Sequence, residues 1–186
     1  MKVTEKTLGE IESKFNTLSP FLKMEYLEEC SKENADLNIK RFCCQKLAEL
    51  YESRQMFSEA AKNASSLADM AITFKDKISF FLKETELWIK SNQYDIADET
   101  YRMALAIGNI KEKEEIKKAV KELYNKQAFY FEKTNKNANA LKIYEKLLHI
   151  VEEGEKLELR KKILPLYKKL GKIHEYTVLE EQLGKQ

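Results

Sequence analysis

Apolar residues recur at three- and four-residue steps along almost the whole chain, and this periodicity restricts the fold more than any other sequence feature. The first run contains Leu8, Ile11, Phe15 and Leu18, which would line one side of an α-helix. Similar runs continue to the C-terminal region, without the two-residue alternation that a half-buried strand requires. We therefore expect an all-α protein with about ten helices.

Glycine and proline are scarce, with five glycines and two prolines in 186 residues. Many β and mixed α/β folds need glycine for hairpin turns and phosphate loops, so the low count argues against them and against most nucleotide-binding enzymes. Gly108, Gly154 and Gly171 each follow an apolar helical run, which predicts that each ends a helix. Gly108 in particular is expected to adopt a left-handed C-terminal cap.

Several helix boundaries can also be predicted. Thr7 and Glu10 have the spacing of a capping box, and Asp36 and Asp76 are suitable residues to begin later helices. Residues 110–133 predict one long helix. Pro165 is expected to kink its helix or end the first part of it.

Charge and composition indicate a protein of the cytosol. The net charge is +2, which is not the basic excess typical of a nucleic-acid-binding domain. The apolar runs are shorter than the ~20 residues that a membrane span requires, and the first residues lack the apolar core of a signal peptide. Three cysteines without a CxxC pair fit a reducing compartment. We expect a cytoplasmic localisation, no membrane span and no nucleic-acid partner.

Three segments of the chain resemble one another. Each has an aromatic residue, then a polar turn, and then an alanine nine residues after the aromatic one. A small residue on the first helix would face that alanine, which lets the two helices approach closely, and the aromatic side chain would fill the space beside them. The residues expected to carry this packing are Ala48, Tyr51, Ala60, Trp88, Ala97, Tyr101, Ala128, Phe131, Ala140 and Tyr144.

A fourth, weaker copy has Tyr167 at the aromatic position and Gly171 in the turn, but Tyr176 replaces the alanine. Successive aromatic positions are 37, 43 and 36 residues apart. The fourth copy could be a terminal capping unit. An ordinary helical bundle with alanine and tyrosine in its core is the alternative interpretation of the same pattern.

The segments QYDIADETYRMAL and NANALKIYEKLL resemble the tetratricopeptide repeat (TPR), and the resemblance covers residues 38–183. It implies an all-α, right-handed superhelix of antiparallel helix pairs, a TPR-like α-solenoid. The spacings exceed the ~34 residues of that family, and no proline ends the second helices, so the chain looks more like the soluble NSF attachment proteins (SNAPs). We expect residues 1–35 to form an N-terminal helical hairpin and residues 36–186 to form the repeats, in a single domain overall.

One class of TPR domain grips a C-terminal carboxylate with Lys and Asn on its first helices. The corresponding positions hold Gln45 and Glu49 in the first copy, and Leu82 and Glu86 in the second. The resemblance therefore does not imply that type of binding.

No set of residues predicts an active site, a metal site or a cofactor. The two histidines, His149 and His174, are too few for a zinc or di-iron site. Cys43 and Cys44 are expected in mid-helix as small buried residues, although nearby Lys40 and Arg41 leave open a reactive thiol. The acidic pairs along the chain are expected to be solvated, and we predict a protein that is not an enzyme.

The most asymmetric charge distribution lies in residues 159–172, which contain no acid. Helical geometry puts its basic residues on one side and its apolar residues on the other. The candidate interaction residues are Arg160, Lys161, Lys168, Lys169 and Lys172. An ordinary solvated lysine surface is the plainer interpretation.

Three functions are compatible with these observations. The first is a non-enzymatic scaffold that binds a peptide or a helix of a partner protein on a concave repeat surface. The second is a SNAP-like trafficking adaptor whose basic helix contacts lipid headgroups or an acidic partner. The third is an uncommon helical enzyme that uses Cys43 or Cys44. Self-association into a homo-oligomer is left open.

Overall fold

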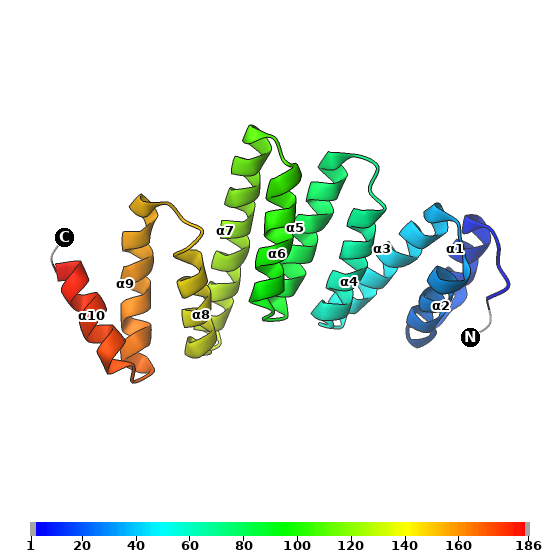
Figure 1. The fold of residues 1–186 in the computed structure, drawn as a ribbon. Coiled ribbons are helices and arrows are strands. Elements are labelled where there is room, and N and C mark those ends of the chain that lie inside the picture. The colour runs from blue at the N-terminus through cyan, green and yellow to red at the C-terminus, as the bar shows by residue number, and fades with distance from the viewer. Residues whose placement is uncertain (1–2, 185–186) are drawn as a thin grey trace. The chain divides into compact units, whose positions relative to one another are not determined.

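The computed structural model describes residues 3–184, and within this range it contains ten α-helices and no strand (Figure 1). This confirms the all-α class and the helix number expected from the periodicity. The chain divides into two compact units, residues 1–113 and 114–186. The predicted boundary after residue 35 and the superhelical arrangement stay predictions.

In the N-terminal unit, each helix packs against the next helix in the sequence. The helices are α1 (Leu8–Thr17), α2 (Pro20–Glu33), α3 (Leu37–Ser53), α4 (Phe57–Asp69), α5 (Phe74–Lys90) and α6 (Tyr94–Ile107). The most extensive contacts join α4 to α5 and α5 to α6. Helix α5 therefore lies at the centre of this unit's core.

The C-terminal unit contains most of the long helix α7 (Ile110–Lys133), which has the bounds predicted from the sequence. It is followed by α8 (Asn137–Leu147), α9 (Glu153–Lys169) and α10 (Ile173–Gly184). Helix α9 packs against both α8 and α10.

Side-chain caps fix several helix starts. The Thr7–Glu10 capping box forms as predicted, and the Asp36 carboxylate accepts bonds from the backbone N–H groups of Asn38 and Ile39. Helix α5 begins earlier than expected, at Phe74, because the hydroxyl oxygen of Thr73 accepts a hydrogen bond from the backbone N–H of Asp76 at 3.0 Å. Asp76 is thus the third residue of the helix and not its cap.

Four helix–turn–helix connections share one backbone geometry. In each of them, the residue four positions after the aromatic one has a positive φ: Gln55 (60°), Asn92 (63°), Asn135 (56°) and Gly171 (69°). The next residue donates its N–H to the carbonyl of the aromatic residue: Met56 to Tyr51, Gln93 to Trp88, Lys136 to Phe131 and Lys172 to Tyr167. This six-residue closure is the Schellman motif, which satisfies carbonyl groups at the end of a helix.

The same turn also begins the following helix. The residue that donates to the aromatic carbonyl then accepts, through its own carbonyl, the N–H of the residue four positions later. That donor is Ala60, Ala97, Ala140 or Tyr176. The positive-φ residues are 37, 43 and 36 residues apart, the same spacings as the aromatic positions. The fourth, weaker sequence copy therefore has the same turn as the other three.

Two of the expectations for glycine were wrong, and one of the two alternatives for Pro165 is excluded. Gly108 has extended backbone angles (φ −76°, ψ 143°) and not the left-handed cap. Gly154 lies in the first turn of α9 and ends no helix. Helix α9 continues past Pro165, so the proline does not divide it. Gly171 follows α9 as predicted, and its φ of 69° is left-handed.

The residues predicted to pack the repeats are mostly in the core. Ala60, Ala97, Ala128 and Ala140 are completely buried. The aromatic residues Tyr51, Trp88, Phe131 and Tyr144 are also buried, whereas Ala48 and Tyr101 are partly exposed. A larger side chain at one of the buried alanines would have to displace its neighbours.

Candidate functional site

The three cysteines lie in the core of the N-terminal unit as free thiols. Burial raises the pKa of Cys43 to about 12 and also raises the pKa values of Cys30 and Cys44. Since the thiolate is the reactive form, this environment argues against the enzyme that uses Cys43 or Cys44.

The most unusual buried group is the carboxyl of Glu84, on α5. Its Oε1 accepts a hydrogen bond of 3.0 Å from the indole N–H of Trp88, whereas Oε2 is buried without a partner in the described part of the chain. Desolvation raises the pKa of Glu84. Glu84 lines none of the cavities described for residues 3–184. Its carboxyl group belongs to the helix packing.

Two further features are absent from residues 3–184. No group of three or more His, Cys, Asp and Glu residues could hold a metal ion there. None of the helices in this range combines the length and the apolar character that would be needed to cross a bilayer.

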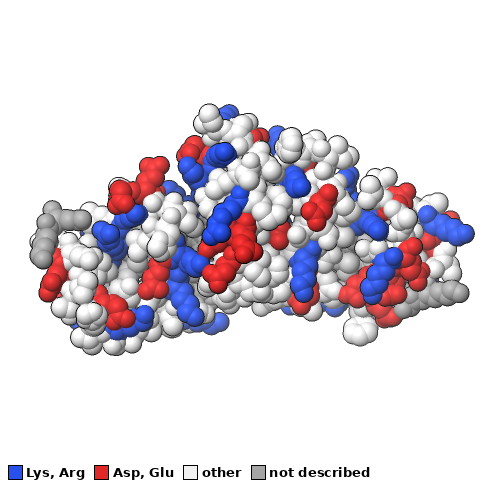
Figure 2. Space-filling model, in the orientation of Figure 1, with Lys and Arg blue, Asp and Glu red and all other residues white. Residues whose placement is uncertain are grey.

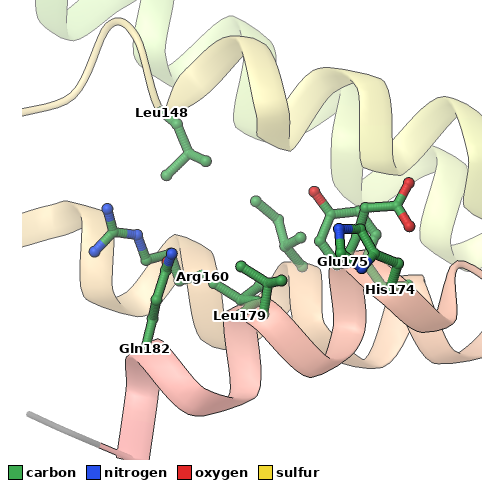
Figure 3. Close-up of a pocket in the computed structure, with 9 residues that line it drawn as sticks. Leu148, Arg160, His174, Glu175, Leu179 and Gln182 are labelled. Carbon is green, nitrogen blue, oxygen red and sulfur yellow. The ribbon is translucent and has the colours of Figure 1, made fainter.

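A cavity of about 360 Å³ lies between α8, α9 and α10 of the C-terminal unit (Figure 3). Its lining is mainly apolar and includes Leu148, Ile163 and Leu179. Figure 3 shows Arg160 and Gln182 beside each other at one end, and His174 and Glu175 at the other. This cavity could accept an apolar side chain, with Arg160 as a hydrogen-bond donor at its rim.

The structure distributes the predicted basic residues over several environments. Arg160 is half-buried and lines the cavity. Lys161 forms an ion pair with Glu158 at 2.8 Å, and Lys172, in the turn after α9, lies 3.7 Å from Glu175. Lys168 and Lys169 are exposed, and neither forms an ion pair with any residue between 3 and 184. Of the four lysines, only Lys168 and Lys169 are therefore free to meet a partner without first breaking an internal pair.

In the N-terminal unit, two lysines of α5 are neutralised by acids of α3 and α5. Lys83 and Lys90 on α5 both contact Glu52 on α3 at 2.8 Å. They also contact Glu86 on α5, at 3.2 Å and 2.6 Å. Together the four side chains form a closed network of two cations and two anions, which connects the first helices of two successive repeats.

The equivalent positions of the C-terminal unit have a different composition. Counting from the aromatic residue, Glu52, Lys83, Glu86 and Lys90 correspond to Glu132, Lys162, Pro165 and Lys169. The acid two residues before the aromatic one is thus replaced by Pro165. In the preceding repeat it is replaced by Phe129, which is 55% exposed.

Contacts around Tyr144 place a lysine of α9 and an acid of α7 near one aromatic side chain. The ammonium of Lys162 lies 5.7 Å from the centre of the Tyr144 ring. Burial and the nearby Glu132 carboxylate, in that order, raise the pKa of Tyr144. Lys162 of α9 and Glu132 of α7 thus approach the same side chain.

Two lysines of the C-terminal unit lack the acid that neutralises the equivalent lysine of the N-terminal unit. Lys46 and Lys83 pair with Glu49 and Glu86, three residues later, at 2.8 Å and 3.2 Å. The counterparts of these lysines are Lys126 and Lys162. Within residues 3–184, neither of them has an ion-pair partner.

We call this group the lysine surface; it extends beyond the residues predicted from the sequence. It consists of Lys126, Phe129 and Lys133 on α7 and Lys162, Pro165, Lys168 and Lys169 on α9. All seven side chains are exposed. An ion pair of 2.5 Å between Lys121 and Glu155 joins the two helices. The residues on α7 could have been found from the sequence. If the four copies are aligned on their aromatic residues, the acid two positions earlier is seen to be lost in the third copy.

The surface drawn in Figure 2 carries interspersed basic and acidic side chains over the helices of both units. Any excess of one sign of charge on this surface is therefore confined to local groups of residues. Comparisons with protein-family models and with curated proteins find no match for the chain.

Proposed function

We propose that this protein is a non-enzymatic, TPR-like interaction scaffold that binds a peptide or a helix of a partner protein. In this proposal, antiparallel helix pairs stack into a right-handed superhelix, and the first helices of the pairs line its concave side. Stacked helical hairpins of this kind produce extended binding surfaces because each repeat is slightly rotated from the previous one.

The observation that carries the proposal is the turn that recurs four times. One combination of aromatic residue, positive-φ residue and closing hydrogen bond is found at Gln55, Asn92, Asn135 and Gly171. In an irregular helical bundle, nothing requires the same turn to recur at the spacing of the aromatic positions. The repetition favours a repeat protein, and the sequence similarity to TPR segments agrees with it.

A selection from a phage-displayed library of random 12-residue peptides would test the proposal. We expect peptides that bind at a 1:1 ratio with micromolar dissociation constants, measured by calorimetry. The bound peptide should slow hydrogen exchange at the backbone amides of the first helix of each pair. A variant with the exposed substitutions Gln45→Arg and Glu49→Arg, on the first of those helices, should change which peptides are selected. The absence of any enriched peptide, or protection only on second helices, would contradict the proposal.

A SNAP-like adaptor at a membrane is the second candidate, and the exposed Lys168 and Lys169 favour it. Each such charge close to an anionic bilayer contributes about 1 kcal/mol. Co-sedimentation with vesicles that contain phosphatidylserine would test it. Binding at low salt that Lys168→Ala/Lys169→Ala abolishes is the expected result, and protein that stays in the supernatant would exclude this candidate.

A further inference from the structure

We infer that the lysine surface of the C-terminal unit is the docking site for an acidic segment of a partner protein, with carboxylates about 10 Å apart and apolar residues between them. This inference rests on the proposed binding function and names the chemistry of the partner.

The first argument is the loss of internal neutralisation. In the N-terminal unit, Glu49 and Glu86 neutralise the lysines that precede them by three residues. Phe129 and Pro165 occupy the equivalent positions of the C-terminal unit, while the lysines are retained as Lys126 and Lys162. Unpaired lysines at positions that are neutralised in the other unit give this surface a local positive potential, which complements an acidic ligand.

The second argument is the spacing of the charges along α9. Lys162 and Lys169 are seven residues apart, as are Lys161 and Lys168. Seven residues make two helical turns, so the members of each pair lie almost in line, separated by about 10 Å of helical rise. A segment in the polyproline II conformation covers about the same distance in three residues, which is one full turn, so every third side chain lies on the same face. A helix covers it in seven residues. A carboxylate at every third position of such a segment would therefore match the unpaired Lys162 and Lys169.

The third argument is the apolar content of the surface. Phe129 is 55% exposed, and the ammonium of Lys133 lies 4.5 Å from the centre of its ring. Pro165 is also exposed. An apolar residue of the ligand can cover these side chains while its carboxylates meet the lysines. Burial of that area adds about 25 cal/mol for each Å².

The acidic residues around the surface favour a narrow ligand. Glu132 lies beside Tyr144, and Glu158, one turn before Lys162, pairs with Lys161, so acids adjoin the strip of free cations at two points. A bilayer or a nucleic-acid duplex presents a broad array of negative charge and would also meet these carboxylates. A single acidic segment can follow the strip and avoid them.

Fluorescence anisotropy with two peptide probes would test the inference on the full chain. The acidic probe is fluorescein-labelled (Glu-Ser-Leu)₄, and the neutral probe is (Gln-Ser-Leu)₄. We expect the acidic probe to bind at least ten times more tightly at 50 mM salt, and its affinity to fall at 300 mM salt. Equal binding of the two probes, or no binding of either, would overturn the inference.

Four variants locate the site. Lys168→Glu/Lys169→Glu should weaken the acidic probe at least tenfold, whereas Lys75→Glu, at an exposed lysine of the other unit, should leave it unchanged. Pro165→Glu restores the missing acid and should weaken the probe severalfold, and Pro165→Ala, which removes the proline without adding charge, should not. Circular dichroism melting curves would identify any variant that fails to fold.

The outcomes separate this inference from the proposed function. If the phage library gives binders whose affinity does not depend on Lys168 and Lys169, the protein is a scaffold and the inference fails. If phosphatidylserine vesicles bind more tightly than the acidic probe, with the same lysine dependence, the partner is a lipid surface and the inference also fails. If no peptide of any kind binds, the proposed function fails with it.

Discussion

Helices α5 and α9 occupy equivalent positions in two repeats, and each is 17 residues long. Both end in the same Schellman turn, at Asn92 and at Gly171. Yet α5 buries seven residues, whereas α9 buries only Leu159, Ile163 and Leu166. The turn is thus a local property of the chain, while the contribution of a helix to the core depends on its neighbours.

The difference in burial indicates a division of labour. Helix α5 uses its aromatic and aliphatic residues in packing between α4 and α6, and its Lys83 and Lys90 in a closed ionic network. Helix α9 has Pro165 in its interior and keeps its lysines exposed. The first is suited to stability, and the second is suited to binding.

Truncation of the aromatic residue should reveal the largest difference between the two helices. Trp88→Ala in α5 removes a side chain that is 6% exposed, together with its hydrogen bond to the Glu84 carboxylate. We expect a loss of about 3–5 kcal/mol in the free energy of unfolding, measured with urea.

Tyr167→Ala, the equivalent change in α9, should cost about half as much, because Tyr167 is partly exposed. The intact hydrogen bond from its hydroxyl to Glu145, at 3.1 Å, contributes part of that loss. Equal losses for the two variants would contradict the proposed division of labour.

Enlargement of the residue nine positions after the aromatic one should give the next largest effect. Ala97 is completely buried, so Ala97→Leu is expected to destabilise the protein by about 1–3 kcal/mol through overpacking. Tyr176 has the equivalent position in the last repeat and is partly exposed. Tyr176→Leu should change the stability by less than about 1 kcal/mol. Thermal melting monitored by circular dichroism measures both, and an Ala97→Leu variant as stable as the wild type would refute the close helix contact.

Substitutions in the turns test the local part of the comparison. Gly171→Ala places a Cβ atom at φ 69° and should cost about 1 kcal/mol. Gln55→Gly, in the first turn, relieves the same conformation and should stabilise the protein by a few tenths of a kcal/mol. If instead Gly171→Ala were neutral by urea denaturation, the left-handed turn would not form in the last repeat.

The smallest effect concerns pH. Because burial raises the pKa of Glu84 in the folded protein, the folded state retains a proton that the unfolded state has already released. Stability should fall as pH rises from the unfolded pKa of this carboxyl through its folded pKa. Glu84→Gln removes that dependence and should be more stable than the wild type at pH 8, but not at pH 4. Parallel melting curves of wild type and variant across this range would contradict the assignment.

The sequence alone predicts the parts of the fold that depend on neighbours along the chain. The ten helices, the Thr7 cap and the helix end before Gly171 follow from periodicity and local propensity. Gly154 was misassigned because a glycine after an apolar run can stop a helix or stand in the first turn of the next one. Helix α9 tolerates Pro165 because the buried Ile163 and Leu166 anchor the residues on both sides of the proline in the core. Rules based on neighbouring residues do not include this tertiary packing.

The candidate site was predicted only in part for a similar reason. A run of lysines in the sequence does not reveal which of them have partners. Lys161 meets Glu158 one helical turn away, as local spacing allows, but the neutralisation of Lys83 and Lys90 depends on Glu52, which is far away in the sequence. Lys126 and Phe129 join the lysine surface through the register of the repeats, which single-residue patterns do not show.

In the N-terminal unit, each helix touches mainly its neighbours along the chain, and this has a consequence for how the unit opens. With few contacts between distant segments, the folding nucleus can form at any hairpin and spread, and the ends can fray while the middle remains closed. Amide exchange should therefore be slowest in α5 and faster toward α1, in a gradient and not in a single step. A nascent chain on the ribosome could close its first hairpins before the lysine surface has been synthesised.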